Sequence, residues 1–141
     1  MILKNCKITQ KQFYLLSFTW GIIMTSIGCI ISLVLIIIGK KPKKNQYGWY
    51  FEIGNGSSGS EFGCMCIVHK NPSQYLLDHE FGHAVQNCIF GPGMVFITLA
   101  SAIRYHYRKI AFKRGKFNLP GYDDIWFEGQ ATKLGEYYRT H

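Results

Sequence analysis

Acidic side chains are scarce in this chain of 141 residues, which has 8 Asp and Glu against 16 Lys and Arg. The resulting net charge of +8 fits a nucleic-acid partner, an anionic lipid surface or the flanks of a membrane segment. No DNA- or RNA-binding motif accompanies the basic residues, so we expect no nucleic-acid partner. The length itself fits one folded domain.

The cysteines do not form the even set that a disulfide framework requires. There are five of them: Cys6, Cys29, Cys64, Cys66 and Cys88. Free thiols are typical of a reducing compartment, which favours the cytoplasmic side for the folded part of the chain. Cys64 and Cys66 share one face of an expected strand, but no second cysteine pair completes a metal site, so we interpret both as core residues.

Charge is absent altogether from Phe13 to Ile38. About 20 apolar residues cross a bilayer, so this run predicts one tilted transmembrane helix. It is too long for the apolar part of a signal peptide, and no small-x-small cleavage site follows it. We therefore expect a single-pass membrane protein in which residues 1–44 hold a retained anchor and residues 45–141 form the folded domain.

Lysines flank the apolar run on both sides, and their numbers are nearly balanced. Lys4, Lys7 and Lys11 precede the run, and Lys40, Lys41, Lys43 and Lys44 follow it. Because basic residues favour the cytoplasmic side, four against three gives only a narrow preference for orientation. The basic excess is therefore best explained as a juxtamembrane feature.

The first part of the folded domain has the pattern of a β-hairpin. Residues 47–53 are rich in aromatic and branched side chains, and residues 61–69 form a second such run. The Gly- and Ser-rich segment 54–60 between them predicts a flexible turn.

A helix is expected next, because Asn71 is a good N-cap and Pro72 is favoured at a first helical position. It should run to about Ile89, where Gly91-Pro92-Gly93 ends it. One face carries an apolar stripe that predicts burial, and its members are Leu77, Phe81, Ala84, Val85 and Cys88.

Two further segments follow. Met94 to Ile103 is apolar but too short to span a bilayer, and it continues into a basic, aromatic run. This fits either a helix in the membrane interface or a core helix with a solvated basic end. Asp123 or Asp124 then caps a last helix. That helix has an apolar face made of Phe127, Ala131, Leu134 and Tyr138.

The residues that carry chemistry lie on the first of these helices. His79-Glu80-Phe81-Gly82-His83 has the pattern H-E-x-x-H. On a helix, residues i and i+4 lie on one face, so both imidazoles can bind one metal ion. Glu80 would then stand beside a metal-activated water and take its proton. A catalytic zinc has three protein ligands as a rule, so a third one is required.

The third ligand has several candidates downstream: His106, Asp123, Asp124, Glu128 and Glu136. A metzincin would have Gly and His where this chain has Gln86 and Ile89, so that class is excluded. Glu128 borders the apolar face of the last helix, where a carboxylate needs a partner that a metal would supply. It is the best candidate because of the sequence pattern around it.

The segment Glu128-Gly129-Gln130-Ala131 resembles the E-x-x-A stretch of gluzincin metallopeptidases, and together with 79–83 the chain resembles small, membrane-anchored bacterial members of that group. The resemblance implies an α+β fold: a minimal zincin-like domain with a short β-hairpin, an active-site helix and a third-ligand helix. It implies Zn²⁺ held by His79, His83 and Glu128, with Glu80 as general base and acid. An extended peptide or protein substrate would pair with the strand at 62–69.

The chain departs from the gluzincin pattern in two ways. Thr132 stands where many members have an Asp that orients a ligand His, and we assign that role to Asp124 instead. The interval from His83 to Glu128 is also longer than in the largest gluzincin families. Gly82, Gly129 and Gly135 should let the two site helices approach closely.

The prediction is therefore a membrane-anchored zinc metallopeptidase that hydrolyses peptide bonds, with the lipid bilayer and a polypeptide substrate as partners. Tyr137 or Tyr138 could stabilise the oxyanion, although packing explains both tyrosines better. The alternative is a non-catalytic, membrane-associated binding module that keeps a structural or vestigial metal site. The two hypotheses differ in the role of Glu80.

Overall fold

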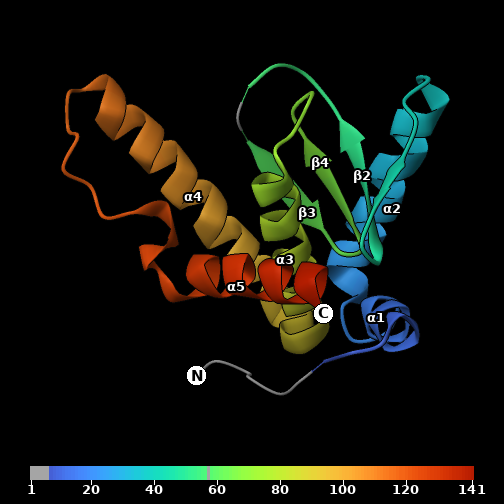
Figure 1. Ribbon diagram of the computed structural model, residues 1–141. Helices are drawn as coiled ribbons and strands as arrows, with labels where there is room; N and C mark the ends of the chain where they lie inside the picture. The colour runs from blue at the N-terminus through green and yellow to red at the C-terminus, as the bar shows by residue number, and fades with distance from the viewer. Residues whose placement is uncertain (1–6, 57) are drawn as a thin grey trace.

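The computed structural model describes residues 7–56 and 58–141, and it combines α-helices with one small mixed sheet (Figure 1). The α+β class expected from the sequence is therefore confirmed. Lys4 and Cys6 lie outside the described residues.

The apolar run at the N-terminus forms two helices rather than the one that was predicted. They are α1 (Gln10–Ser17) and α2 (Ile22–Ile37), and they meet at an angle of 91°. The turn between them is held against the core, because Trp20 Nε1 donates to the carbonyl of Ile89 and Asn87 Nδ2 donates to that of Gly21. A single straight helix over 13–38 is thus wrong.

Residues from this N-terminal part enter the same core as the rest of the chain. Phe13 of α1 is fully buried, and its ring packs against those of Tyr47 and Phe81. The phenol of Tyr138 completes this cluster from the other end of the chain and accepts a hydrogen bond from the Ile8 backbone. The two parts that the sequence divides at residue 44 are joined by these contacts.

The sheet has the strand order β1-β2-β4-β3. Its strands are β1 (Lys43–Asn45), β2 (Gly48–Glu52), β3 (Gly59–Phe62) and β4 (Met65–Val68). The predicted hairpin between 47–53 and 61–69 is wrong, because β2 and β4 pair in parallel.

Tight turns explain the sheet topology. Gly63 has a φ of +72° and lies in the two-residue turn between β3 and β4, so the run 61–69 folds back on itself instead of pairing with β2. A second turn, with Gln46 at a φ of +54°, joins β1 to β2. The predicted second strand is thus divided between β3 and β4.

The sheet lies between two helices because its apolar side chains alternate between its faces. On one face, Phe51 and Met65 pack against Leu35 of α2. On the other, Cys66 and Val68 pack against the helix that carries the H-E-x-x-H motif. The interpretation of Cys66 as a core residue is confirmed.

That motif helix is α3 (Gln74–Phe90), close to the predicted bounds. Its N-cap is Ser73, whose hydroxyl accepts from the Leu76 backbone, and not Asn71, which has a φ of +54°. Gly91 ends the helix with a φ of +55°, and a short 3₁₀ turn η1 (Gly91–Gly93) follows.

The helix α4 (Met94–Lys113) leaves η1 in a new direction, as Figure 1 shows. Of its residues only Met94 and Ala111 are buried, which disfavours the interpretation of this segment as a core helix. The run Gln74–Lys113 is long and apolar enough by composition to cross a membrane, and its most apolar window is 17% buried. Because η1 divides this run, it is not one straight helix.

The chain ends with a 3₁₀ turn η2 (Tyr122–Asp124) and the helix α5 (Trp126–Thr140), which crosses in front of α3 in Figure 1. Neither Asp123 nor Asp124 caps α5, whose N-cap is Ile125 without a side-chain hydrogen bond. The Asp124 carboxylate instead accepts from the Gly121 backbone at η2.

Candidate metal centre

Close packing of α3 on α5 creates the site. An added Cβ at Gly82 would lie 1.8 Å from the Ala131 carbonyl oxygen, and one at Gly135 would lie 1.7 Å from that of Asp78. Only glycine allows the backbones to approach in this way. The expectation of close approach holds for these two glycines, whereas Gly129 faces the Asp123 carbonyl within its own segment.

His79, His83 and Glu128 are buried and converge between the two helices. The Nε2 atoms of His79 and His83 lie 3.0 and 3.1 Å from the same carboxylate oxygen of Glu128, and all three ligand atoms lie within 4.8 Å of one another. Two ligands of a tetrahedral zinc are about 3.3 Å apart when each bond is about 2.05 Å long. The two His–Glu128 distances therefore need to widen by only a few tenths of an ångström for the residues to hold such an ion.

The outer nitrogens of both imidazoles are already used. His79 Nδ1 lies 2.8 Å from the Thr132 hydroxyl, which in turn donates to Asp123 over 3.0 Å. His83 Nδ1 lies 2.7 Å from Gln86 Oε1, an acceptor. Each ring therefore carries a proton on Nδ1, which leaves Nε2 as the nitrogen that faces the Glu128 carboxylate. Burial lowers the pKa of His83, but the hydrogen bond to Glu128 outweighs it and raises the pKa to about 9, so a proton lies between the two groups in the metal-free protein. A metal ion could take the place of that proton.

The carboxylate that orients His79 is Asp123 rather than Asp124, which corrects the sequence assignment. It acts through Thr132 and also accepts from the Tyr75 hydroxyl over 2.7 Å. Thr132 lies one turn after Glu128, where many gluzincins have their Asp. With Thr132 at this position, the Asp123 carboxylate reaches His79 through the Thr132 hydroxyl instead of directly.

Gln86 holds the second histidine. Its Nε2 donates to the Phe127 carbonyl over 2.7 Å and to Gln130 Oε1 over 2.9 Å, so its Oε1 stays directed at His83. Gln86 is completely buried, which is unusual for this residue type. Sequence reasoning used Gln86 only to exclude the metzincins, and its place one turn after His83 was the available signal.

Two further side chains, those of Ser101 and Tyr122, lie beside the Glu128 carboxylate. The Ser101 hydroxyl of α4 donates to Glu128 Oε1, and the phenol of Tyr122 lies close enough to this carboxylate for the Glu128 charge to act on its pKa. Burial raises the pKa of Tyr122 and the Glu128 charge adds to the effect, so the phenol stays a donor. Burial opposes ionisation of Glu128, but the hydrogen bonds from His79 and His83 hold its pKa well below the usual range.

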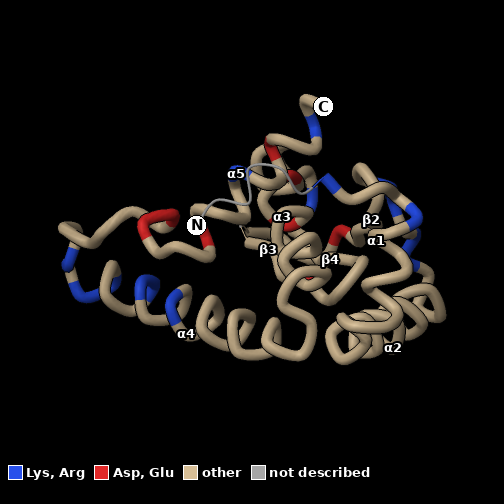
Figure 2. Tube along the Cα trace, turned by 90° about the horizontal axis from the view of Figure 1, so that it is seen from below, with Lys and Arg blue, Asp and Glu red and all other residues tan. Residues whose placement is uncertain are grey.

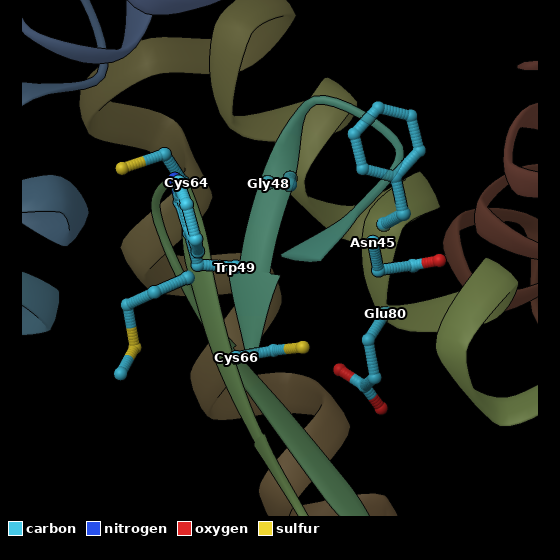
Figure 3. Close-up of a pocket in the computed structure, with 9 residues that line it drawn as sticks. Asn45, Gly48, Trp49, Cys64, Cys66 and Glu80 are labelled. Carbon is cyan, nitrogen blue, oxygen red and sulfur yellow. The ribbon is translucent and has the colours of Figure 1, made fainter. Parts of the chain in front are cut away.

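Glu80 is buried beside the ligands and points at the sheet. Its carboxylate contacts the backbone of β3, where an added Cβ at Gly59 would lie 2.9 Å from Glu80 Oε1. Figure 3 shows it facing Cys66 across a small cavity. Within 7–56 and 58–141 this carboxylate makes no hydrogen bond, and burial raises its pKa. The Glu80 carboxylate is therefore available to accept a proton, because no group of the described chain is hydrogen-bonded to it.

The strand beside Glu80 is not the one that the sequence suggested. β4 is an inner strand with β2 and β3 as neighbours, so its backbone cannot pair with a substrate. Among the described residues β3 pairs only with β4, which makes Gly59–Phe62 the open edge next to α3. The strand at 62–69 that the sequence suggested as the substrate edge is thus replaced by β3 as the candidate.

The remaining sequence candidates lie away from the metal centre. His106 and Glu136 are exposed, and Tyr137 stacks on His141. Tyr138 is buried in the core cluster with Phe81. Packing is thus the better account of both C-terminal tyrosines, and the phenol at the site is that of Tyr122.

Comparison of this chain with known proteins gives no match to a family model, to a curated protein or to a solved structure. The assignment of a function therefore depends on the geometry of the site.

Proposed function

We propose that this protein is a membrane-associated zinc metallopeptidase of the gluzincin type. The observation that carries the proposal is the buried His79-His83-Glu128 cluster, in which two imidazole Nε2 atoms and a carboxylate oxygen face one another while Glu80 lies alongside. Two nitrogens and one oxygen, all buried, are a typical catalytic zinc set that leaves one position open.

The residues of the site divide the chemistry among them. Zinc held here would polarise the scissile carbonyl and make a water molecule more acidic. Glu80 takes the proton of the attacking water and later delivers it to the leaving amine. Tyr122 is the phenol near the site that would donate toward the oxygen that gains charge, because its raised pKa keeps it protonated.

Substrate and membrane complete the proposal. An extended polypeptide adds to the free edge of β3, which runs beside Glu80, and the backbone hydrogen bonds place its scissile bond at the site. The apolar N-terminal part attaches the protein to a bilayer, with the site on the cytoplasmic side. α2 alone is about 24 Å long and so is shorter than the roughly 30 Å hydrocarbon layer.

The test compares three proteins: wild type, Glu80→Gln and Glu136→Gln. Each is purified as the full chain in detergent, and its zinc content and its cleavage of unstructured peptides are measured by mass spectrometry. Glu136 is exposed on α5, so its variant controls for the loss of one carboxylate.

We expect about one zinc per chain in all three proteins, and hydrolysis at least 100-fold slower in Glu80→Gln alone. If wild type binds zinc but Glu80→Gln cleaves peptides as fast as wild type, the proposed mechanism is wrong. If zinc is bound and no peptide is cleaved, the non-catalytic alternative is supported.

A further inference from the structure

One side of α4 carries an apolar stripe that no part of the described chain covers. Its members follow helical spacing and are all strongly exposed, up to 76% at Phe96 and 69% at Ile103. They are Phe96, Leu99, Ile103, Tyr107 and Ile110. A stripe of this kind on a soluble monomer is an interaction surface rather than ordinary surface.

α2 carries a matching stripe on its outer side. Its members are Ile23, Ile27, Ile30, Val34 and Ile37, and they reach an exposure of 73% at Ile37. The inner side of α2 packs along the sheet from Thr25, which contacts Gly63, to Leu35, which contacts Phe51. A perpendicular α2 would carry the polar strands into hydrocarbon, whereas a flat α2 would leave them outside it.

The two helices that carry the stripes lie along one side of the molecule. Figure 2 shows α2 and α4 along the same edge, with α5 at the opposite edge. Neither helix contains an acidic residue, whereas the C-terminal half of α4 is basic and Lys40 and Lys41 follow α2. We call these two outward stripes together the apolar face. Its apolar surface and basic ends complement an anionic lipid bilayer.

The metal centre lies directly behind this face. Ser101, on the opposite side of α4 from Leu99 and Ile103, donates to Glu128. Arg104 continues that inner side by donating to the carbonyls of Gly121 and Tyr122. One helix diameter, about 10–12 Å, therefore separates the exposed stripe from the metal ligands.

We propose that α2 and α4 bind flat on an anionic bilayer, and that the substrates are polypeptide segments adjoining the bilayer surface. The proposal of a substrate class rests on the proposed function, whereas the binding mode does not. The metal ligands would then lie about 10–12 Å above the bilayer surface, a distance that about three or four residues of extended chain can span. The enzyme should therefore reach bonds very close to a membrane anchor.

Binding is tested with the full chain and vesicles of phosphatidylcholine, with or without phosphatidylglycerol, that contain brominated acyl chains. Ile103→Trp adds an indole on the apolar face, and Lys133→Trp adds one on exposed α5 at the other edge. The added fluorescence of Ile103→Trp should be quenched and that of Lys133→Trp should not. Equal quenching, or none, overturns the binding mode.

The double variant Leu99→Glu, Ile103→Glu tests the face without a fluorophore. Its charge change equals that of Lys133→Glu, so the latter is the matched control. We expect at least about tenfold weaker binding to anionic vesicles for the double variant alone, with unchanged zinc content to show that it folds. If the face instead joins two copies, light scattering in detergent detects a dimer that only the double variant disrupts, and the lipid proposal fails.

The substrate class is tested with one cleavable sequence attached to a lipid anchor through spacers of about 4, 8 and 16 residues. We expect cleavage with the shortest spacer, and the double variant should lose it while it still cleaves the free peptide. Cleavage only with the longest spacer overturns the proposal. A wild type that binds zinc and vesicles but cleaves neither free nor anchored peptide indicates failure of the proposed function instead.

Discussion

Gly82→Ala is a substitution that must push apart the two helices of the metal centre. The new Cβ would lie 1.8 Å from the Ala131 carbonyl oxygen, and such contacts do not occur below 3.0 Å. Because the obstacle is backbone, α5 must move away from α3 by about 1.2 Å. Overpacking against a rigid backbone costs about 3 kcal/mol, the upper end of the usual range.

The displacement also acts on the metal. His79 and His83 lie on α3 and Glu128 on α5, and metal–ligand distances tolerate only about 0.2 Å. We therefore expect zinc affinity to fall at least tenfold, measured by competition with a chromophoric chelator, and the melting temperature of the metal-free protein to fall as well.

Gly93→Ala is the matched control for this experiment. Gly93 has helical dihedral angles, and the atom nearest to an added Cβ is 4.0 Å away. Alanine should stabilise the protein there by about 0.4–1 kcal/mol, with no change in zinc affinity. The packing argument is refuted if Gly82→Ala binds zinc as tightly as Gly93→Ala does.

Three further predictions concern single side chains. Asp123→Asn should weaken zinc binding about tenfold and Asp124→Asn should not, because only Asp123 reaches His79 through Thr132; equal titration curves would contradict this relay. Glu128→Gln should lower zinc affinity at least tenfold, and unchanged affinity would remove Glu128 from the ligand set. Burial raises the pKa of Glu61 from 4.5 to about 8. Between these two pH values the metal-free folded protein holds a proton that the unfolded chain releases, so the free energy of unfolding of wild type falls by up to about 5 kcal/mol as the pH rises from 4.5 to 8. Glu61→Gln should therefore match wild type near pH 4.5 and be more stable at pH 8, and an equal difference in melting temperature at both pH values would contradict the raised pKa.

The sequence predicted the site better than it predicted the sheet. The H-E-x-x-H helix and the second helix with Glu128 depend on local spacing, and the structure brings their three candidate ligands together. The parallel pairing of β2 with β4 depends on contacts between distant residues, which alternation of side chains does not specify. Gly63 was a local signal for a turn, and it could have shown that the predicted strand at 61–69 is two strands.

The misassigned orienting carboxylate has a similar cause. Asp123 and Asp124 are neighbours in sequence, and the direction of each side chain follows from the 3₁₀ turn before α5 rather than from residue type. The bend between α1 and α2 is equally non-local, since Trp20 and Asn87 hold it by contacts between α3 and the N-terminal turn. A run of apolar residues shows that a segment is hydrophobic, but it does not show where the helix bends.

The coordination of zinc in the purified wild-type protein tests the central claim most directly. X-ray absorption at the zinc edge should show about four nitrogen and oxygen ligands at about 2.0–2.1 Å, with the imidazole signature of His79 and His83. Sulfur at about 2.3 Å would assign the metal to cysteines instead. Either that result or the absence of stoichiometric zinc would contradict a metal centre formed by His79, His83 and Glu128.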